Sequence, residues 1–319
     1  MLRRRLRGVV TVLSFAGGVA AAAPGAWAQG DQSAPPEAPP PAFVAPPPGY
    51  EPPTQYAQGA PPAPAVAEVA PTFMTLDRMD ASTRFGIQIG WDKLDPERVS
   101  DGFVTRYEPY AQYVFPGQAG GIYAHVPISH IFDFNRADAT GFGNIDLGGF
   151  FMPTHKAELI LRGGLILPTA SNGNGEAGNI ISAFERLTDL LLAPHGYTTL
   201  RVSASTLQQR DNLFFRADAG FDLAIDKPAS DTTSVYFRGN LAAGIRATGV
   251  DITAELVNVG AVNGSGYSGI EDRFFHTAGF SLRSQGEDQF HIGTVFPLDK
   301  GPRGDLWIIS VGYQRAMNL

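Results

Sequence analysis

Hydrophobic and polar residues alternate with a period of two through most of the chain after residue 81. "RFGIQIGW" (Arg84–Trp91) and "LFFRADAGFDLAI" (Leu213–Ile225) are clear examples. Strict alternation over such lengths is typical of strands that bury one face. Twelve segments of this kind follow one another to the end of the chain. The pattern therefore predicts an all-β protein with about 12 strands.

The two faces of these strands differ in a way that favours a membrane barrel over a soluble sandwich. The apolar face is smooth and almost free of charge. The polar face is rich in Gly and in charges of both signs, whereas the polar face of a soluble sandwich would carry many Lys and Thr in contact with water. The strands are also long enough for a tilted bilayer crossing. We predict an antiparallel up-and-down transmembrane β-barrel. The charged residues of the polar face are the candidates to line its lumen: Arg106, Glu108, Asp146, Glu158, Arg162, Arg216, Asp218, Asp222 and Arg238.

The connections between the predicted strands alternate between short and long. "PGQAG", "PTHK" and "ATGV" are short, while "DKLDPERVSDG", "SHIFDFNRADATG" and the stretch Thr169–Tyr197 are longer. Outer-membrane barrels have short periplasmic turns and longer outer loops. The alternation predicts that both ends of the barrel domain lie on the periplasmic side.

The N-terminal region predicts export. Four arginines up to Arg7 precede a short apolar core, Val9–Ala23, and "AWA" (Ala26–Ala28) has the form of a cleavage site. We expect a signal peptide over 1–28, a disordered Pro-rich periplasmic linker over 29–78, and the barrel over 79–319. The linker is expected either to act as a plain spacer or to contact the cell wall or a periplasmic protein. The predicted location is the outer membrane of a Gram-negative bacterium.

Charge and composition exclude several classes of function. The chain has no cysteine, so thiol catalysis and zinc–thiolate sites are excluded. The net charge is -7, and loss of the four signal-peptide arginines leaves about -11. Such an acidic chain is not expected to bind nucleic acid.

The longest predicted loop contains "SNGNGEAGN", in which Gly173, Gly175 and Gly178 match the dinucleotide-binding pattern G-x-G-x-x-G. That pattern requires a parallel β-α-β unit, whereas the neighbouring strands here are joined by hairpins, so no cofactor is expected. An amphipathic helix is predicted instead, with a capping box at Ser182 and Glu185 if it begins there. It could cap the barrel, narrow the lumen or lie against the lipid. The candidates for a constriction or lid are Ile180, Ile181, Phe184, Leu187, Leu190 and Leu191.

The remaining candidate chemistry is sparse. None of the six histidines shows metal-ligand spacing, so no metal site is expected. Ser268 and His276 form a conceivable pair for a lipid-modifying barrel enzyme. A hairpin turn centred on Thr154 would place Asp146 directly opposite Arg162, where their charges attract. A second ladder could join Arg216, Asp218, Asp222 and Arg238; such charges either fill a narrow lumen or tune passage through it.

"GFGNIDLGGFF" (Gly141–Phe151) followed by "LRGGLILPTAS" (Leu161–Ser171) resembles a family of bacterial outer-membrane barrels. These are the transporters named for phenol-degradation (MetA-pathway) operons. The resemblance implies a twelve-stranded barrel and a passive channel for small compounds, aromatic or apolar ones among them. One departure is the final "AMNL", where such barrels usually end in Phe or Trp.

Three functions are therefore compared. The first is a porin-like channel without enzyme activity, whose partners are outer-membrane lipid and a small solute. The second is a structural or interaction barrel with a plugged lumen, tethered through its Pro-rich arm. The third is the lipid-modifying enzyme.

Overall fold

The computed structural model describes residues 71, 73–77, 82–94, 102–117, 119–134, 137–154, 158–225, 233–263, 274–299 and 306–317. All of them belong to one compact unit. The expected signal peptide and most of the expected linker lie outside these residues.

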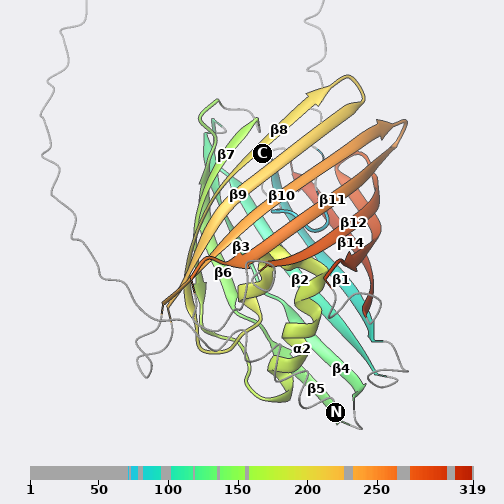
Figure 1. Cartoon of the computed structure of the whole chain (residues 1–319). Helices are drawn as coiled ribbons and strands as arrows, with labels where there is room; N and C mark the ends of the chain where they lie inside the picture. The colour runs from blue at the N-terminus through green and yellow to red at the C-terminus, as the bar shows by residue number, and fades with distance from the viewer. Residues whose placement is uncertain are drawn as a thin grey trace, which may run out of the picture. The chain divides into compact units, whose positions relative to one another are not determined.

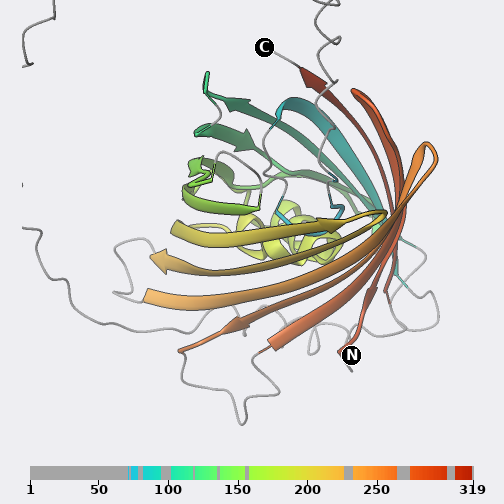
Figure 2. The same cartoon turned by 90° about the horizontal axis from the view of Figure 1, so that it is seen from above.

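One closed antiparallel sheet forms the wall of the molecule (Figures 1 and 2). Neighbours in sequence pair as hairpins, and β1 pairs with both β2 and β14, which closes the barrel. The strand segments among the described residues are β1 (Thr83–Leu94), β2 (Phe103–Val114), β3 (Gly120–His125), β4 (Ile128–Phe134), β5 (Ala137–Phe142), β6 (Ile145–Phe151), β7 (Leu159–Leu167), β8 (Thr198–Arg210), β9 (Leu213–Ile225), β10 (Thr233–Ala247), β11 (Val250–Ala261), β12 (Phe274–Ser284), β13 (Asp288–Pro297) and β14 (Leu306–Met317).

These segments make twelve wall positions, which confirms the predicted barrel. β3 and β4 both pair with β2, one after the other along its length, and therefore form one strand with a break. The break falls at Val126 and Pro127, where the Val126 N–H donates to the carbonyl oxygen of Pro109 on β2 at 3.3 Å. Proline has no N–H to donate to a sheet, so the ladder is interrupted there. β5 and β6 are likewise two parts of one strand, separated by Gly143 and Asn144.

One predicted loop is in fact strand. The stretch "SHIFDFNRADATG" forms most of β4 and β5, which pair with each other as an antiparallel hairpin. The prediction was wrong because the stretch is too polar to show the alternation of a strand. A hairpin this long also needs a partner for its inner face, and that partner is distant in sequence. The helix of the longest loop supplies that partner by packing on β4 and β5.

The two faces of the wall have opposite character. On the outside lie apolar side chains such as Phe215, Leu241 and Trp307, which are more than half exposed. Their sequence neighbours Arg216, Ala242 and Ile308 point inward and are buried. An apolar outer band and a polar interior are the signature of a transmembrane barrel. No helix in the described part of the chain is long and apolar enough to cross a membrane.

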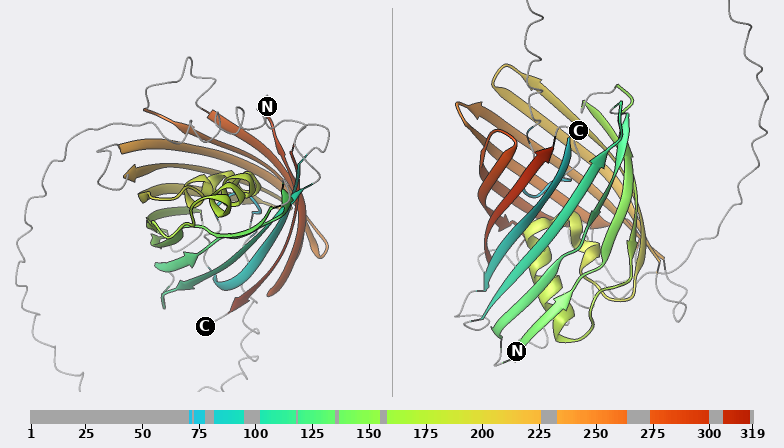
Figure 3. Two further views of the ribbon diagram at one scale, coloured as in Figure 1. Left: turned by 90° about the horizontal axis from the view of Figure 1, so that it is seen from below. Right: turned by 180° about the vertical axis from the view of Figure 1, so that it is seen from behind.

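The connection from β7 to β8 turns into the barrel and forms a helix there (Figures 2 and 3). It begins as α2 (Asn174–Ser182) and continues as the 3₁₀ segment η1 (Ala183–Leu192). We call these two segments together the lumen helix. The predicted capping box is absent: Ser182 lies at the end of α2, and its hydroxyl donates to the carbonyl oxygen of Asn179. The helix begins earlier than the apolar pattern suggested.

The glycines of "GNGEAG" are explained by backbone conformation at Gly173 and by packing at Gly175 and Gly178. Gly173 precedes α2 with φ 67°, a conformation that glycine adopts without strain. A Cβ on Gly178 would lie 2.9 Å from Ile131 Cγ1 on β4. Gly175 and Gly141 on β5 approach so closely that a side chain on Gly141 would overlap the carbonyl of Gly175. The match to the dinucleotide-binding pattern thus reflects close contact between helix and hairpin.

Candidate functional site in the barrel lumen

The lumen helix lies across the inside of the barrel. α2 contacts β1, β2, β4 and β5, and η1 contacts β11, β12, β13 and β14 on other parts of the wall. All six apolar residues predicted for a constriction or lid are buried, and none is more than 9% exposed. Phe184 packs edge-on against Phe275 of β12, with ring centroids 6.2 Å apart. Of the three placements considered from sequence, the helix takes the one inside the lumen.

A short segment before the barrel, Phe73–Asp77, is also buried in the lumen, and we call it the strap. The carboxylate of Glu255 on β11 accepts hydrogen bonds from the backbone N–H groups of Met74 (2.8 Å) and Thr75 (2.7 Å). The Thr75 hydroxyl donates to the same carboxylate at 2.5 Å. Phe73 packs edge-on against Phe214 of β9. These residues fall at the end of the stretch expected to be a disordered linker.

Asp77 ends the strap among arginines of the wall. Its Oδ1 accepts a hydrogen bond from Arg162 Nη1 at 2.7 Å, and Arg238 Nη1 lies 3.4 Å from its Oδ2. Burial opposes the charged form, but these arginines hold the pKa of Asp77 well below its usual range. The strap is therefore held as an anion at its C-terminal end.

Asp146 is the centre of a second group of charges. Its Oδ2 accepts from Arg162 at 2.6 Å and from Arg201 at 3.0 Å, and His125 Nε2 lies 3.0 Å away. The predicted pair of Asp146 and Arg162 thus exists, but the predicted register is wrong. Asp146 faces Ile166 and Arg162 faces Phe150. The arginine side chain is long enough to reach the carboxylate diagonally across the hairpin.

The other predicted ladder divides into two pairs. Arg216 Nε donates to Asp218 at 2.8 Å, and Arg238 Nε lies 3.1 Å from Asp222. Arg201, which the sequence reading did not single out, joins Asp222 to the Asp146 group, because its Nε donates to Asp222 Oδ1 at 3.0 Å. The inner face of the wall thus carries a continuous network rather than isolated pairs.

The lumen helix enters this network through Arg186 and Asp189. Asp189 Oδ2 accepts from Arg186 Nε at 2.8 Å, and its Oδ1 accepts from Arg201 Nη1 at 3.2 Å. Arg186 Nε also lies 3.6 Å from Glu108 Oε1 on β2. Glu108 in turn pairs with Arg106. Sequence analysis missed the helix charges because a loop residue carries no strand phase that would show which way it points.

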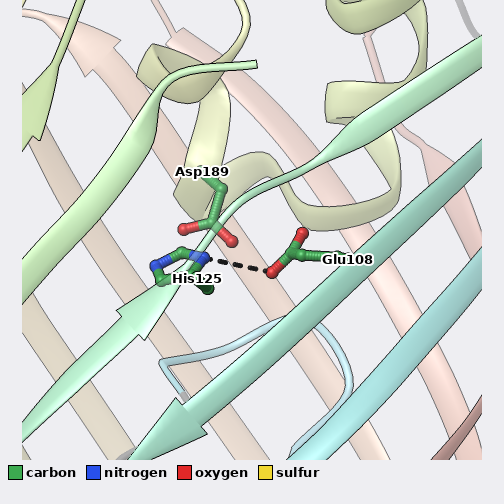
Figure 4. A group of neighbouring side chains, drawn as sticks. All are labelled: Glu108, His125 and Asp189. Carbon is green, nitrogen blue, oxygen red and sulfur yellow. Dashed lines mark hydrogen bonds and ion pairs between the residues drawn. The ribbon is translucent and has the colours of Figure 1, made fainter. Parts of the chain in front are cut away.

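Glu108, His125 and Asp189 come together in the way that metal ligands do (Figure 4). One ligand atom of each lies within 4.8 Å of the others, and His125 Nδ1 is 3.2 Å from Glu108 Oε1. However, Arg106, Arg186 and Arg201 already occupy the carboxylates. Three guanidinium groups at this distance would repel a divalent cation, so the cluster suits an ion-paired network better than a metal.

The space left beside this cluster is small. The cavity between the strap, the helix and the wall residues Tyr123, His125 and Arg162 measures about 20 Å³. That volume holds roughly one water molecule. The helix and the strap therefore pack closely against this part of the wall.

Eight of the nine predicted lumen residues are buried on the inner face. The exception is Glu158, which is exposed in the turn directly before β7. Two buried groups stand apart from the network. Both carboxylate oxygens of Asp92 lack a hydrogen-bond partner, and so do Nε and Nη1 of Arg283. Neither residue was predicted, since strand phase gives the face of a residue but not its partners.

The fold and the charged interior define a class, the twelve-stranded outer-membrane β-barrels. Within the described chain, the lumen of this one is filled by a loop helix and an N-terminal strap.

The chain was also compared with known proteins. No model of a known protein family matches the sequence, and no curated protein matches it. Among solved structures, the COG4313 outer membrane channel from Pseudomonas putida F1 is similar with a TM-score of 0.50 and 11% identity, over 80% of this chain and 99% of that one. The NanC porin is similar with a TM-score of 0.42 and 10% identity, over 74% and 100%. LpxR from Salmonella typhimurium gives 0.41 and 10%, over 73% and 100%. The similarity to the COG4313 channel supports the fold. The family suggested by "GFGNIDLGGFF" stays a prediction.

Proposed function

We propose that this protein is an outer-membrane channel that gives small solutes passive passage. The observation that carries the proposal is the way in which the lumen is filled. An eight-stranded barrel is just filled by its own side chains, whereas twelve strands enclose a wider space. Here that space is occupied by two segments that enter from a loop and from the N-terminal arm. Segments of this kind can leave without breaking the hydrogen bonds of the wall.

The lumen helix is the proposed constriction. It is anchored to the wall by polar contacts that can be exchanged for water, such as Glu185 Oε1 with Gln88 Nε2 (2.7 Å) and with the Ser310 hydroxyl (2.6 Å). A cavity of about 20 Å³ beside it is too small for a solute. Passage therefore requires the helix, the strap or both to move.

Charged walls are the proposed source of selectivity. Rings and ladders of charged side chains in a pore favour ions of one sign and orient polar solutes. The resemblance to the phenol-degradation transporters adds aromatic or apolar small compounds as candidate solutes. The barrel position implies outer-membrane lipid as the surrounding partner.

The second candidate function is a structural or interaction barrel with a permanently plugged lumen. It is favoured by the burial of the strap, whose residues Met74, Thr75 and Leu76 are fully enclosed. The strap continues from the Pro-rich arm, and that arm would then tether the barrel to the cell wall or to a periplasmic protein.

An enzyme is not proposed. Of the conceivable Ser–His pair, Ser268 lies outside the described residues. His276 Nδ1 lies 2.8 Å from Asp299 Oδ1.

Conductance in planar lipid bilayers separates the two candidates. We expect step-like conductance from the full chain, and larger steps from a variant without residues 172–193, because the deletion removes the constriction. Heat-modifiable migration in gels confirms that each protein has folded as a barrel. If both folded proteins fail to conduct, the channel proposal is wrong and the plugged structural barrel is favoured.

A further inference from the structure

A groove interrupts the outer surface of the barrel over β8, β9, β10 and β11, which lie side by side in the wall (Figure 1). Its volume is about 570 Å³. Sites for small organic ligands usually measure about 300–1,000 Å³. The apolar side chains that surround the groove belong to the outward face of the strands: Phe215, Ala217, Leu241, Ala243, Ala254 and Leu256.

The groove forms because two small side chains lie between two large ones. Ala243 of β10 faces Ala254 of β11, and Phe215 and Phe280 flank this pair in the same row across the sheet. Each phenylalanine is 53% exposed and stands out from the wall. The neighbouring residues on β10 and β11, Ala242 among them, point into the lumen, so the floor of the trough is backbone.

The apolar part of the groove suits a hydrocarbon chain. It lies in the apolar outer band, which in a transmembrane barrel contacts the hydrocarbon of the bilayer. The molecules that reach the groove there are lipids. A chain lying in the trough contacts the alanines below it and the rings of Phe215 and Phe280 beside it, and each contact between carbon atoms adds a small dispersion energy.

Polar side chains border the groove on β8. Gln208 lies opposite Phe215, and Arg210 lies two residues further on the same face, opposite Leu213. Arg210 is exposed, and its side chain forms no ion pair with another residue of the described chain. It is the last residue of β8, so its guanidinium lies near the level of the lipid headgroups. A guanidinium presents paired N–H donors that match two oxygens of a phosphate.

We propose that this groove binds one phospholipid, with an acyl chain in the trough between Phe215 and Phe280 and the phosphate on Arg210. The short turn from β8 to β9 is expected on the periplasmic side, where the leaflet of an outer membrane consists of phospholipid. The free charge of Arg210 favours this occupant over a second copy of the chain, whose outer band is apolar and offers no anion. The site requires a barrel in lipid and does not depend on the channel function.

Native mass spectrometry of the full-length protein, released from detergent micelles, tests the site by counting retained lipids. Two probes with the same acyl chains are titrated, a phosphatidylglycerol and the diacylglycerol that lacks its phosphate. We expect wild type to retain one phosphatidylglycerol at least tenfold more tightly than the diacylglycerol. Arg210→Gln should lose this preference, because it removes the cation. Ala243→Phe should weaken the binding of both lipids at least tenfold, because its ring fills the trough.

The matched control is Ala111→Phe, which places the same ring on the exposed face of β2, outside the groove. It should bind both lipids as wild type does, and heat-modifiable migration in gels checks that each variant has folded. The proposal is overturned if wild type retains no phospholipid, if Ala243→Phe and Ala111→Phe bind alike, or if Arg210→Gln keeps the preference for the phosphate. A lipid-free wild-type dimer that Ala243→Phe dissociates would also overturn it, and would assign the groove to a second copy of the chain.

Discussion

Arg186 of the lumen helix donates hydrogen bonds to the carbonyl oxygens of Met74 and Leu76, at 2.6 and 2.9 Å. The same guanidinium contacts Asp189 on its own segment and Glu108 on β2. One side chain thereby joins the strap, the helix and the wall. Thr188 adds a further bond, because its hydroxyl donates to the carbonyl oxygen of Thr75 at 2.8 Å. The two segments that fill the lumen are therefore coupled.

Replacing Arg186 should release the strap. In Arg186→Met the strap loses two charge-assisted hydrogen bonds, while methionine retains much of the side-chain volume. The chain has no cysteine, so Leu76→Cys gives a unique reporter for a water-soluble maleimide. We expect labelling of the double variant to be about tenfold faster than that of Leu76→Cys alone, which corresponds to about 1.4 kcal/mol in the opening equilibrium. Arg210→Met, at the exposed end of β8, is the control, and equal rates in all three proteins would contradict the coupling.

A methyl group on Gly90 should displace the lumen helix. The carboxylate of Glu185 rests directly on Gly90, so an added Cβ overlaps it and forces it away from Gln88 and Ser310. We expect Gly90→Ala to lower the free energy of unfolding by about 1–3 kcal/mol, as overpacking does. Conductance should rise because the helix is less firmly held.

The matched control is Gly163→Ala on β7, where a Cβ would meet nothing within 4 Å. Both substitutions place alanine in a strand, so their difference isolates the contact with Glu185. If the two variants have the same stability and conductance, Glu185 does not anchor the helix.

The stability of the protein should depend on the protonation of Glu185. Burial raises the pKa of Glu185 against the opposing charge of Arg106, and its Oε2 has no hydrogen-bond partner. A carboxyl whose pKa is higher in the folded than in the unfolded state contributes stability below the unfolded value of about 4.3, and this contribution is lost as pH rises through the folded value. Urea unfolding should therefore show that the free energy of unfolding declines between pH 4 and pH 8. This decline should be smaller in Glu185→Gln. The exposed Glu158→Gln should retain the full decline, and parallel curves for all three proteins would argue against a titrating Glu185.

The lipid-facing role of the outer band can be tested on β10. Leu241 lies near the middle of the strand and is 57% exposed. Arginine at the bilayer midplane costs about 2–4 kcal/mol in a membrane barrel, and about 0–1 kcal/mol near the interface. Leu241→Arg should therefore destabilise the barrel folded in lipid vesicles much more than Val250→Arg, which lies at the start of β11. A protein that tolerates both equally would have this surface in water.

The wall of the barrel follows from the sequence, because a period of two assigns each strand residue to one of two faces. The alternation of Phe215, Arg216 and Ala217 is enough to predict which side chains point outward. The number of strands follows from counting such segments. The hairpin of β4 and β5 was missed because its stretch is too polar to show the pattern, and its inner face is covered by α2, which is distant in sequence.

The contents of the lumen depend on the tertiary structure. The strap was assigned to a linker from composition, since five residues next to a Pro-rich tract carry no periodic signal. Its partner Glu255 is 180 residues from Thr75, and no local pattern predicts a contact at that separation. The sequence also placed Asp146 and Arg162 on one face but gave the wrong register.

The sequence by itself thus determined the closed barrel, its inner and outer faces and a helix in the longest loop. Only the tertiary structure decided that this helix and the strap enter the lumen, and that the buried carboxylate oxygens of Asp92 lack a hydrogen-bond partner among the described residues. The physical reason is that strand phase depends on the local backbone geometry. Ion pairs depend on which side chains the closed barrel brings within a few ångströms of one another.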